Sequence, residues 1–140
     1  MKIDSIKDGI VIDHITAGKA MKIYNLLHLD RLDCRVALIT NVNSRIMGKK
    51  DIIKIDADIA IDTNILGYVD PNATVNIIKD EVIVDKKKLE LPEKLTNVIT
   101  CKNPRCITSV EQELPQIFNL TDKEKQVYRC LYCETKANNA

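Results

Sequence analysis

The sequence contains no tryptophan and a single phenylalanine, and aromatic residues make up 4% of its 140 residues. Few rings are available to stack on exposed bases, which argues against a protein that binds single-stranded nucleic acid. Lysine and arginine number 21 against 20 acidic residues, so the formal net charge is only +1. No overall field therefore gathers nucleic acid or a membrane surface, and any anion site must be built locally.

Long apolar runs are absent as well, since no stretch approaches the roughly 20 residues needed to cross a bilayer. The segment from Met1 to Asp8 alternates charged and apolar residues, where a secretory signal needs an uninterrupted apolar core. We therefore expect a soluble, cytoplasmic protein. Gly18-Lys19 lacks both the upstream glycine and the following hydroxyl of a phosphate-binding loop, which excludes a nucleoside triphosphatase of that type.

Hydrophobic periodicity divides most of the chain into short elements. β-Branched runs at 10–15 and 35–42 predict strands, and apolar residues at helical spacing predict a helix within 17–29. Alternation from Asp51 to Asp62 predicts a strand with one wet face. Asn43 to Gly48 has the residues of a hairpin loop between the second and third strands.

A second helix is predicted to begin at a cap formed by Asp62 or Thr63 and to end before Pro71. Strands at 73–78 and 81–84 follow it. The order is βαββαβ with an extra edge strand, which predicts an α+β fold with a ferredoxin-like sheet covered by two helices on one face.

Polar and proline-bearing segments interrupt this pattern at Lys86-Lys87-Lys88 and at Leu91-Pro92-Glu93-Lys94. Such composition is typical of a linker between domains, although a solvated loop within one domain has it too. We expect one domain at residues 1–92 and a smaller, mostly β domain at 93–140.

Four of the five cysteines form two close pairs in that smaller domain. Cys101, Cys106, Cys130 and Cys133 follow the pattern C-x4-C-x23-C-x2-C. Two such turns present four thiolates to one point, which suits a tetrahedral zinc ion. The alternatives are four reduced cysteines without a metal and an iron–sulfur cluster. Cys34, the fifth cysteine, lies elsewhere and is assigned no role.

A closed site of four sulfurs leaves no coordination position for water or substrate, so the expected zinc is structural. A segment of about 46 residues is also near the size at which metals or disulfides are usually needed to hold a fold. The sequence offers no nucleophile with a nearby base either. We therefore expect a non-enzyme. The rival interpretation is a zinc-ribbon protein that binds nucleic acid, which the neutral charge and the few aromatics disfavour.

Several separated segments resemble one known family in the same order and with family spacing. They are Val11-Ile12-Asp13-His14-Ile15, Met47 to Ile55, Pro71 to Ile78, Leu91-Pro92-Glu93 and the two cysteine segments Cys101 to Ile107 and Cys130 to Glu134. This set resembles the regulatory chain of aspartate carbamoyltransferase from about Asp4 to Glu134.

The resemblance implies an allosteric domain that binds CTP or ATP, and UTP as a further candidate, followed by a zinc domain that contacts the catalytic chain. It also implies a homodimer of regulatory chains, assembly with catalytic trimers and a place in pyrimidine biosynthesis. The positions that match the family's effector site are Asp4, Ser5, Ile6, Val11, Asp13, His14, Lys50, Ile52, Lys54, Asn76, Ile78, Ile83 and Lys86.

His14 and the lysines at these positions suit the negative charge of a nucleoside triphosphate. Asp13 could accept from a ribose hydroxyl, and backbone groups near Ser5, Ile6 and 81–83 could read the base. A solvated face is the ordinary alternative for scattered lysines, and it is the interpretation of Lys87 and Lys88. Glu81 stands where the family has an aromatic residue, which bears on effector preference.

Overall fold

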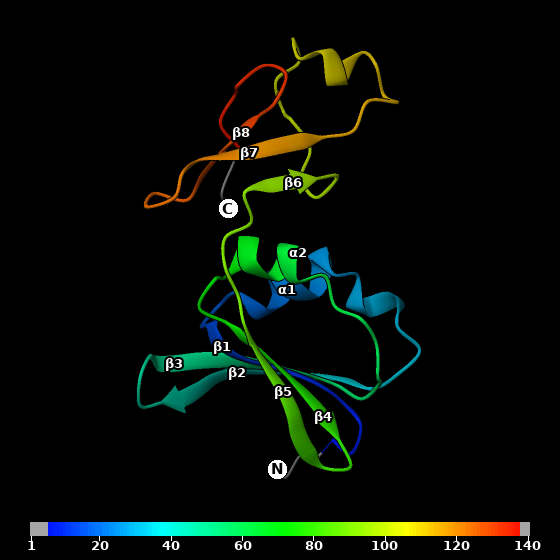
Figure 1. Cartoon of the computed structure of the whole chain (residues 1–140), viewed down its shortest axis with the longest axis vertical. Helices are drawn as coiled ribbons and strands as arrows, with labels where there is room; N and C mark the ends of the chain where they lie inside the picture. Colours follow the sequence, from blue (N-terminus) through cyan, green and yellow to red (C-terminus); the bar gives the residue numbers. More distant parts are fainter. Residues whose placement is uncertain (1–5, 138–140) are drawn as a thin grey trace. The chain divides into compact units, whose positions relative to one another are not determined.

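The structure, a computed structural model, describes residues 6–137. It divides into two compact units, Met1–Glu90 and Leu91–Ala140, each described here by itself (Figure 1). Among the described residues no helix has the length and apolar character that a membrane crossing requires.

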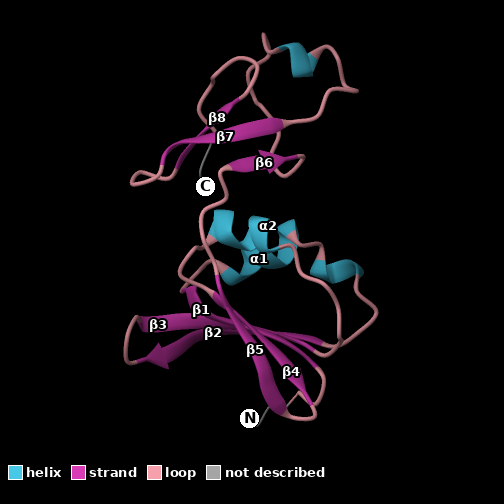
Figure 2. Cartoon of the chain, in the orientation of Figure 1, coloured by secondary structure: helices cyan, strands magenta, loops and turns pink. Residues whose placement is uncertain are grey.

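The first unit is an antiparallel five-stranded sheet with two helices on one face (Figure 2). The sheet order is β2-β3-β1-β4-β5. This order is ferredoxin-like with an added edge strand, so the predicted α+β class and arrangement are confirmed. The elements are β1 (Gly9–Thr16), α1 (Ala20–Leu26), η1 (Leu29–Arg31), β2 (Val36–Ser44), β3 (Gly48–Ile55), α2 (Thr63–Val69), β4 (Thr74–Lys79) and β5 (Val82–Lys88).

The core of this unit lies between the sheet and the helices. Alternate side chains of a strand point to opposite faces of a sheet, and one set is fully buried here. From the strands it includes Ile10, Ile12, Ile53, Ile55 and Val75, and from the helices Ile23 and Leu66. The other set, including Val11, Lys54 and Lys86, lies on the face without helices, which we call the open face. Because the first set is buried against the helices, the side chains of the second set are the ones that remain available to a ligand.

Two buried carboxylates tie the loops to this core. Asp51 on β3 accepts hydrogen bonds from the backbone amides of Gly18, Ala20 and Asn41 at 2.9, 3.3 and 3.1 Å. Asp70 accepts in the same way from the amides of Thr16 and Asn72. Both side chains are fully buried, and paired backbone donors remove much of the cost of burying a carboxylate.

The first helix is shorter than predicted, because it begins at Ala20 and ends at Leu26. Gly18 has φ of +97°, which no helix accommodates, and the Asp51 carboxylate holds the Gly18 and Ala20 amides. At the other end His28 takes a left-handed conformation, with φ of 54°. Local sequence periodicity could not reveal a helix start that depends on a residue 31 positions away.

The strand predicted for 51–62 is wrong beyond Ile55. β3 pairs with β2, whose first residue Val36 lies opposite Ile55. The amide of Asp56 still bonds to the carbonyl of Arg35, but past this point none of the described strands continues beside the chain. The alternation at 57–61 therefore has no ladder to join, and this stretch is a loop.

β5 reaches Lys88, whereas the sequence predicted a strand ending at Val84 and a linker at Lys86–Lys88. Asn76, Val75 and Thr74 of β4 pair with these three lysines. Lysine is tolerated here because β5 is an edge strand whose side chains are all exposed.

Asp62 caps α2, one of the two alternatives predicted. Its carboxylate accepts hydrogen bonds from the amides of Asn64 and Ile65 at 2.9 and 3.3 Å. We expect Asp62→Ala to lower the free energy of unfolding of the first unit by about 1 kcal/mol, because these amides lose their partner. Urea titration followed by circular dichroism measures this. Asp62→Asn, which can still cap, should recover most of the loss, and an Ala variant as stable as the unmodified chain would contradict the assignment.

The second unit is a three-stranded antiparallel sheet in the order β6-β7-β8. Its elements are β6 (Lys94–Thr96), η2 (Ile107–Ser109), β7 (Ile117–Asp122) and β8 (Val127–Cys130). Leu95, Phe118 and Tyr128 form a small buried core. The Tyr128 hydroxyl donates to the carbonyl of Pro92 at 2.6 Å, so it fixes the start of this unit. Because this core has few large apolar residues, the cysteine cluster is the main further source of stability for the unit.

Candidate metal centre and effector face

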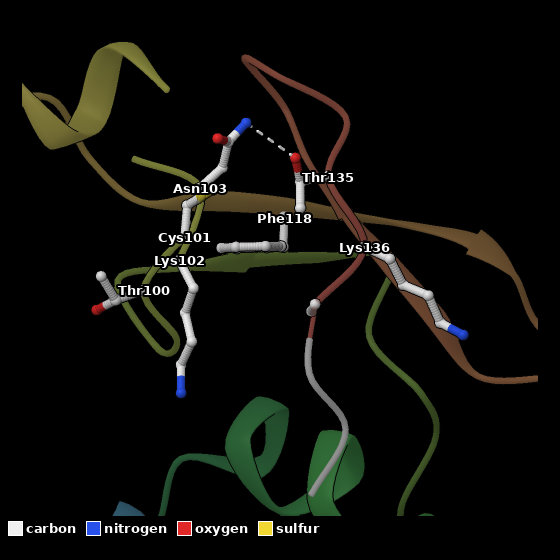
Figure 3. Close-up of a pocket in the computed structure, with 8 residues that line it drawn as sticks. Thr100, Cys101, Lys102, Asn103, Phe118, Thr135 and Lys136 are labelled. Carbon is white, nitrogen blue, oxygen red and sulfur yellow. Dashed lines mark hydrogen bonds between the residues drawn. The ribbon is translucent and has the colours of Figure 1, made fainter. Parts of the chain in front are cut away.

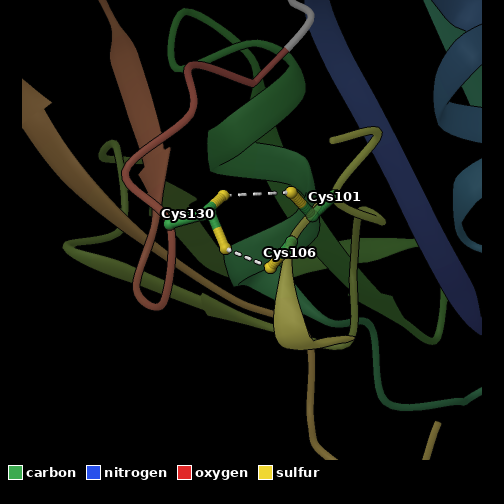
Figure 4. A group of neighbouring side chains, drawn as sticks. Cys101, Cys106 and Cys130 are labelled. Carbon is green, nitrogen blue, oxygen red and sulfur yellow. Dashed lines mark hydrogen bonds between the residues drawn. The ribbon is translucent and has the colours of Figure 1, made fainter. Parts of the chain in front are cut away.

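The second unit brings the four predicted cysteines together. Cys106 precedes η2 and Cys130 ends β8, while Cys101 and Cys133 lie in loops. All four sulfurs lie within 4.8 Å of one another. The sulfurs of Cys101 and Cys133 are 3.6 Å apart, and those of Cys106 and Cys130 are 3.7 Å apart. Figure 4 labels Cys101, Cys106 and Cys130 of this cluster.

These separations fit a metal better than a disulfide. Disulfide sulfurs lie about 2.05 Å apart, well below both measured distances. Four sulfurs at 2.3 Å from a central zinc ion would lie about 3.8 Å from one another at the corners of a tetrahedron. The four protein donors are all cysteine sulfurs, which is the composition of a structural zinc site.

The surroundings of the sulfurs shift the pKa values of two of the thiols in opposite directions. Burial raises the pKa of Cys101 to about 12, with the neighbouring cysteines adding to the rise. The hydrogen bond between Thr135 and Cys133 lowers the pKa of the Cys133 thiol to about 6. Packing four thiols into one buried place disfavours four free anions, and a divalent cation would offset that repulsion.

A hollow of about 380 Å³ lies beside this cluster (Figure 3). Cys101 and Phe118 form part of its wall. The Asn103 amide donates to the Thr135 hydroxyl oxygen across it, at 3.2 Å. None of the described residues predicted to bind an effector lines this hollow.

Most of the predicted effector residues lie on the open face of the first unit. Residues directly opposite in adjacent antiparallel strands point to the same face. Val11 of β1 lies opposite Lys54 of β3 on one side and Asn76 of β4 on the other, and Asn76 lies opposite Lys86 of β5. Lys54, Val11, Asn76 and Lys86 therefore form one continuous row across four strands.

A second cluster lies next to this row, around Asp13. The Asp13 carboxylate accepts from Lys50 Nζ at 2.9 Å and from the His14 amide at 2.6 Å. The His14 ring reaches Thr74 Oγ1 at 3.2 Å. His14 has φ of 57° at an irregularity in the β1–β3 pairing, which lets its ring and the Asp13 carboxylate occupy the same region.

Asp13 is a partly buried carboxylate with a lowered pKa. Burial alone would raise the pKa, but the hydrogen bonds from Lys50 and from the His14 amide outweigh burial and bring it below its ordinary value of 3.8. The Lys50 and Asp13 side chains are only 16% and 22% exposed. Lys50 is thus held in place by Asp13.

We expect the Asp13–Lys50 pair to stabilise the first unit at neutral pH by about 1 kcal/mol. Because the folded pKa is lowered, this contribution is present above the ordinary carboxyl pKa and is lost as pH falls through the lowered value. Asp13→Asn should therefore unfold more easily than the unmodified chain at pH 7, and the difference between the two stabilities should begin to shrink below about pH 4, near the ordinary carboxyl pKa. Urea titrations from pH 3 to 7 measure this, and a constant difference down to pH 3 would contradict it.

Asn76 contributes a buried atom without a partner. The residue is 6% exposed, and among residues 6–137 its Oδ1 is the buried side-chain oxygen or nitrogen that lacks a hydrogen bond. A buried unsatisfied acceptor is costly. A ligand that donates to this atom would remove the cost.

The remaining predicted residues fall around these two clusters. Ile52 shares its face with Lys50 and Lys54 by alternation on β3, and Ile78 of β4 pairs with Ile83 of β5. Ile6 is buried and packs over Gly9. A Cβ on Gly9 would stand 2.3 Å from the carbonyl oxygen of Ile55 and 2.7 Å from Cγ2 of Ile6, so only glycine fits there. Asp4 and Ser5 lie outside the described residues.

Thr74 and Lys88 lie on the open face near Asp13, and neither was among the site residues predicted from the sequence. Asp13 lies opposite Thr74, and Thr74 lies opposite Lys88. Lys88 was interpreted as part of a solvated face, yet it belongs to the same face as Lys86. The signal was available, because a residue two positions along a strand returns to the same side, but it required knowing that β5 continues that far.

Comparison with known proteins gives matches over nearly the whole chain. Residues 1–90 match the family model described as aspartate carbamoyltransferase regulatory chain, allosteric domain, and residues 93–140 match the model for its metal binding domain.

Curated relatives carry the same name. A regulatory chain from Clostridium tetani is 56% identical over 135 residues, covering 96% of this chain and 94% of the relative. One from Clostridium botulinum is 54% identical, covering 96% and 92%, and one from Bifidobacterium longum is 44% identical, covering 98% and 99%. The four-cysteine cluster in residues 93–140 agrees with the metal binding domain that this region matches. The chain therefore belongs to the aspartate carbamoyltransferase regulatory chain family.

Proposed function

We propose that this chain is a non-catalytic regulatory subunit that binds nucleotide effectors on the open face of residues 1–92. The effectors are CTP and ATP, with UTP as a further candidate. Residues 93–140 form a zinc domain that contacts the catalytic chain of aspartate carbamoyltransferase, and through it the effectors control an enzyme of pyrimidine biosynthesis. The zinc ion is held by Cys101, Cys106, Cys130 and Cys133.

The observation that carries the effector proposal is that basic side chains from several strands share the open face. Lys54 and Lys86 lie in one row, and Lys50 and His14 lie in the adjoining cluster. In a chain with a net charge of +1, lysines from two strands gathered on one face are a local anion site. A nucleoside triphosphate carries up to four negative charges, which such donors neutralise by charge-assisted hydrogen bonds.

The open face also contains groups suited to a base and a sugar. Asn76 Oδ1 is a buried acceptor without a partner, and an exocyclic amino group donates to such an atom. Val11, Ile78 and Ile83 offer aliphatic surface on the same face, which suits a planar ring. Asp13 Oδ2, which lies 4.0 Å from His14 Nδ1, can accept from a ribose hydroxyl, because Oδ1 takes the bonds from Lys50 and the His14 amide.

The metal proposal rests on the donor set. Four thiolates select zinc or an iron–sulfur cluster over hard cations, and sulfur separations of 3.6 and 3.7 Å fit a single zinc ion. When bound, the zinc supplies structural cross-linking rather than chemistry, since its four positions are filled by protein. This supports a subunit without catalytic activity of its own.

The contact with the catalytic chain is proposed on the surface next to the metal. Ile107 and Val110 follow Cys106, and Leu131 and Tyr132 lie between Cys130 and Cys133. All four are large apolar residues left exposed on the second unit, which is unusual for a free surface and typical of an interface.

The homodimer is proposed through the first unit. β2 is an edge strand of nine residues, so its outer side offers backbone donors and acceptors to a second copy. Effector binding would then bias a quaternary equilibrium by the difference in its affinity for two states, a coupling typically worth about 1–3 kcal/mol.

Calorimetric titration of the purified chain with CTP, UTP and ATP, with and without magnesium, tests the proposal. We expect saturable binding of at least one nucleotide and a change in the substrate response of added catalytic chains. Parallel titration with single-stranded DNA at rising salt tests the nucleic-acid alternative, for which binding should be strong and fall steeply. Nucleic-acid binding without nucleotide binding would overturn the proposed function.

A further inference from the structure

The hydroxyl groups of two threonines lie against two different sulfurs of the cysteine cluster. Thr108 Oγ1 is 3.1 Å from Cys106 Sγ, and Thr135 Oγ1 is 3.2 Å from Cys133 Sγ. Each threonine follows the second cysteine of its pair by two residues. Each pair of cysteines therefore has one hydroxyl group, at the same offset along the chain.

The direction of these contacts follows from the state of the sulfur. A metal-bound cysteine is a thiolate and has no proton to give. A threonine hydroxyl can both donate and accept. In the metal-bound chain the hydroxyl must therefore be the donor in both O–H···S contacts.

Asn103 fixes the orientation of Thr135. The amide of Arg105 donates to Asn103 Oδ1 at 3.0 Å, which turns the Asn103 Nδ2 group toward Thr135. Nδ2 then donates to Thr135 Oγ1 at 3.2 Å (Figure 3). Because the oxygen of Thr135 accepts this bond, its own proton remains for the sulfur of Cys133. Asn103 lies within the first cysteine segment, so the relay joins the two cysteine pairs.

The Thr108 hydroxyl is kept as a donor to the Cys106 sulfur by its burial. It is 4% exposed, so water cannot readily replace its hydroxyl group. Four thiolates and one zinc ion carry a net charge of −2 in a partly buried place. Donors that point at the sulfurs disperse that charge and hold each side chain in its ligating position.

We propose that Thr108 and the Asn103–Thr135 pair are positioning residues for the metal, each donating a hydrogen bond through its hydroxyl to one thiolate and so setting how tightly the chain holds its ion. The inference rests on the proposed zinc site. It assigns a role to three side chains that are not themselves ligands.

Competition with a chromogenic zinc chelator, on the full chain, tests this. Thr108→Val keeps the shape of the side chain but removes the donor, and we expect zinc to be held about 10- to 100-fold less tightly. Thr108→Ser should bind like the unmodified chain, because it keeps the hydroxyl group. Thr121→Val is the matched control, since the Thr121 hydroxyl bonds to the Val127 carbonyl in the same unit and touches no sulfur.

Thr135→Val and Asn103→Ala provide a second pair of variants at more exposed positions, where the fold tolerates the change. We expect a smaller loss of affinity than for Thr108→Val, because water can partly replace an exposed donor. Cobalt-substituted protein gives a readout that is independent of affinity. Loss of an O–H···S bond should move the sulfur-to-cobalt charge-transfer band to lower energy in the Val variants and leave it in place for Thr121→Val.

Unchanged affinity and unchanged spectra in both Val variants would overturn the inference while leaving the zinc site intact. Equal losses for Thr108→Ser and Thr108→Val would overturn it as well, since shape rather than the donor would then matter. An unmodified chain that binds no zinc would instead refute the proposed metal site.

Discussion

Cys106→Ala should release the metal and unfold the second unit while the first unit stays folded. Three sulfurs leave the fourth position of the zinc ion to water and hold the ion less tightly than four, and metal binding contributes on the order of 10 kcal/mol to the folding of small zinc domains. The small core around Leu95, Phe118 and Tyr128 cannot replace that amount. Elemental analysis should find less than one zinc per chain, and amide NMR signals from 91–137 should collapse to unfolded positions.

The same variant should lose its association with catalytic chains, because the exposed apolar residues next to the metal lose their arrangement. Nucleotide titration should be retained, since the lysine row belongs to the other unit. Cys34→Ala is the matched control, as Cys34 is the cysteine outside the cluster. Tight association of a metal-free Cys106→Ala chain with the catalytic subunit would contradict this prediction.

Lys86→Ala should weaken CTP or ATP binding by about 10- to 100-fold, the value of one charge-assisted hydrogen bond. Lys86 lies at the end of the row that runs through Asn76 and Val11 to Lys54. Lys54→Ala should have a similar effect from the opposite end. Calorimetric titration measures both, and zinc content should not change.

Lys87→Ala is the matched control for this series. Lys87 is the next residue of β5, but it lies opposite Val75, whose side chain is buried on the helix-covered face. Like Lys86, it is an exposed lysine, but its side chain points to the other side of the sheet. Equal losses for Lys86→Ala and Lys87→Ala would indicate a diffuse charge effect, and unchanged titrations for both Lys86→Ala and Lys54→Ala would remove them from the site.

The sequence could predict what depends on short-range pattern. The alternation along β1 and the helical spacing in α1 gave the order of elements, because they arise from the two faces of one core. The cysteine spacing was equally informative, since two short turns of soft ligands have few other uses. Residues such as Lys54 and Lys86 were identified by resemblance, and pattern alone would have left them as solvated lysines.

Features that depend on distant partners could not be predicted. β3 ends at Ile55 because β2 begins at Val36. The alternation of apolar and polar residues at 57–61 does not indicate where this strand ends. The contact of Asp51 with the α1 start, and that of Asn103 with Thr135 across 32 positions, have no local signature at all. These are side-chain to backbone or side-chain to side-chain bonds that exist only once the chain has folded.

The edges of the five-stranded sheet bear on how the newly made chain avoids aggregation. β5 exposes three consecutive apolar residues, Val82 to Val84, along an edge that pairs with no further strand among residues 6–137. Such an edge would otherwise template sheet growth between molecules. Lys86 to Lys88 follow immediately, and an irregularity at Ile77 and Ile78 interrupts the flat ladder beside them. Charge repulsion and a bent edge are the usual means of preventing such edge-to-edge pairing. Replacing these lysines with neutral residues would therefore lower solubility during expression as well as affinity for nucleotide.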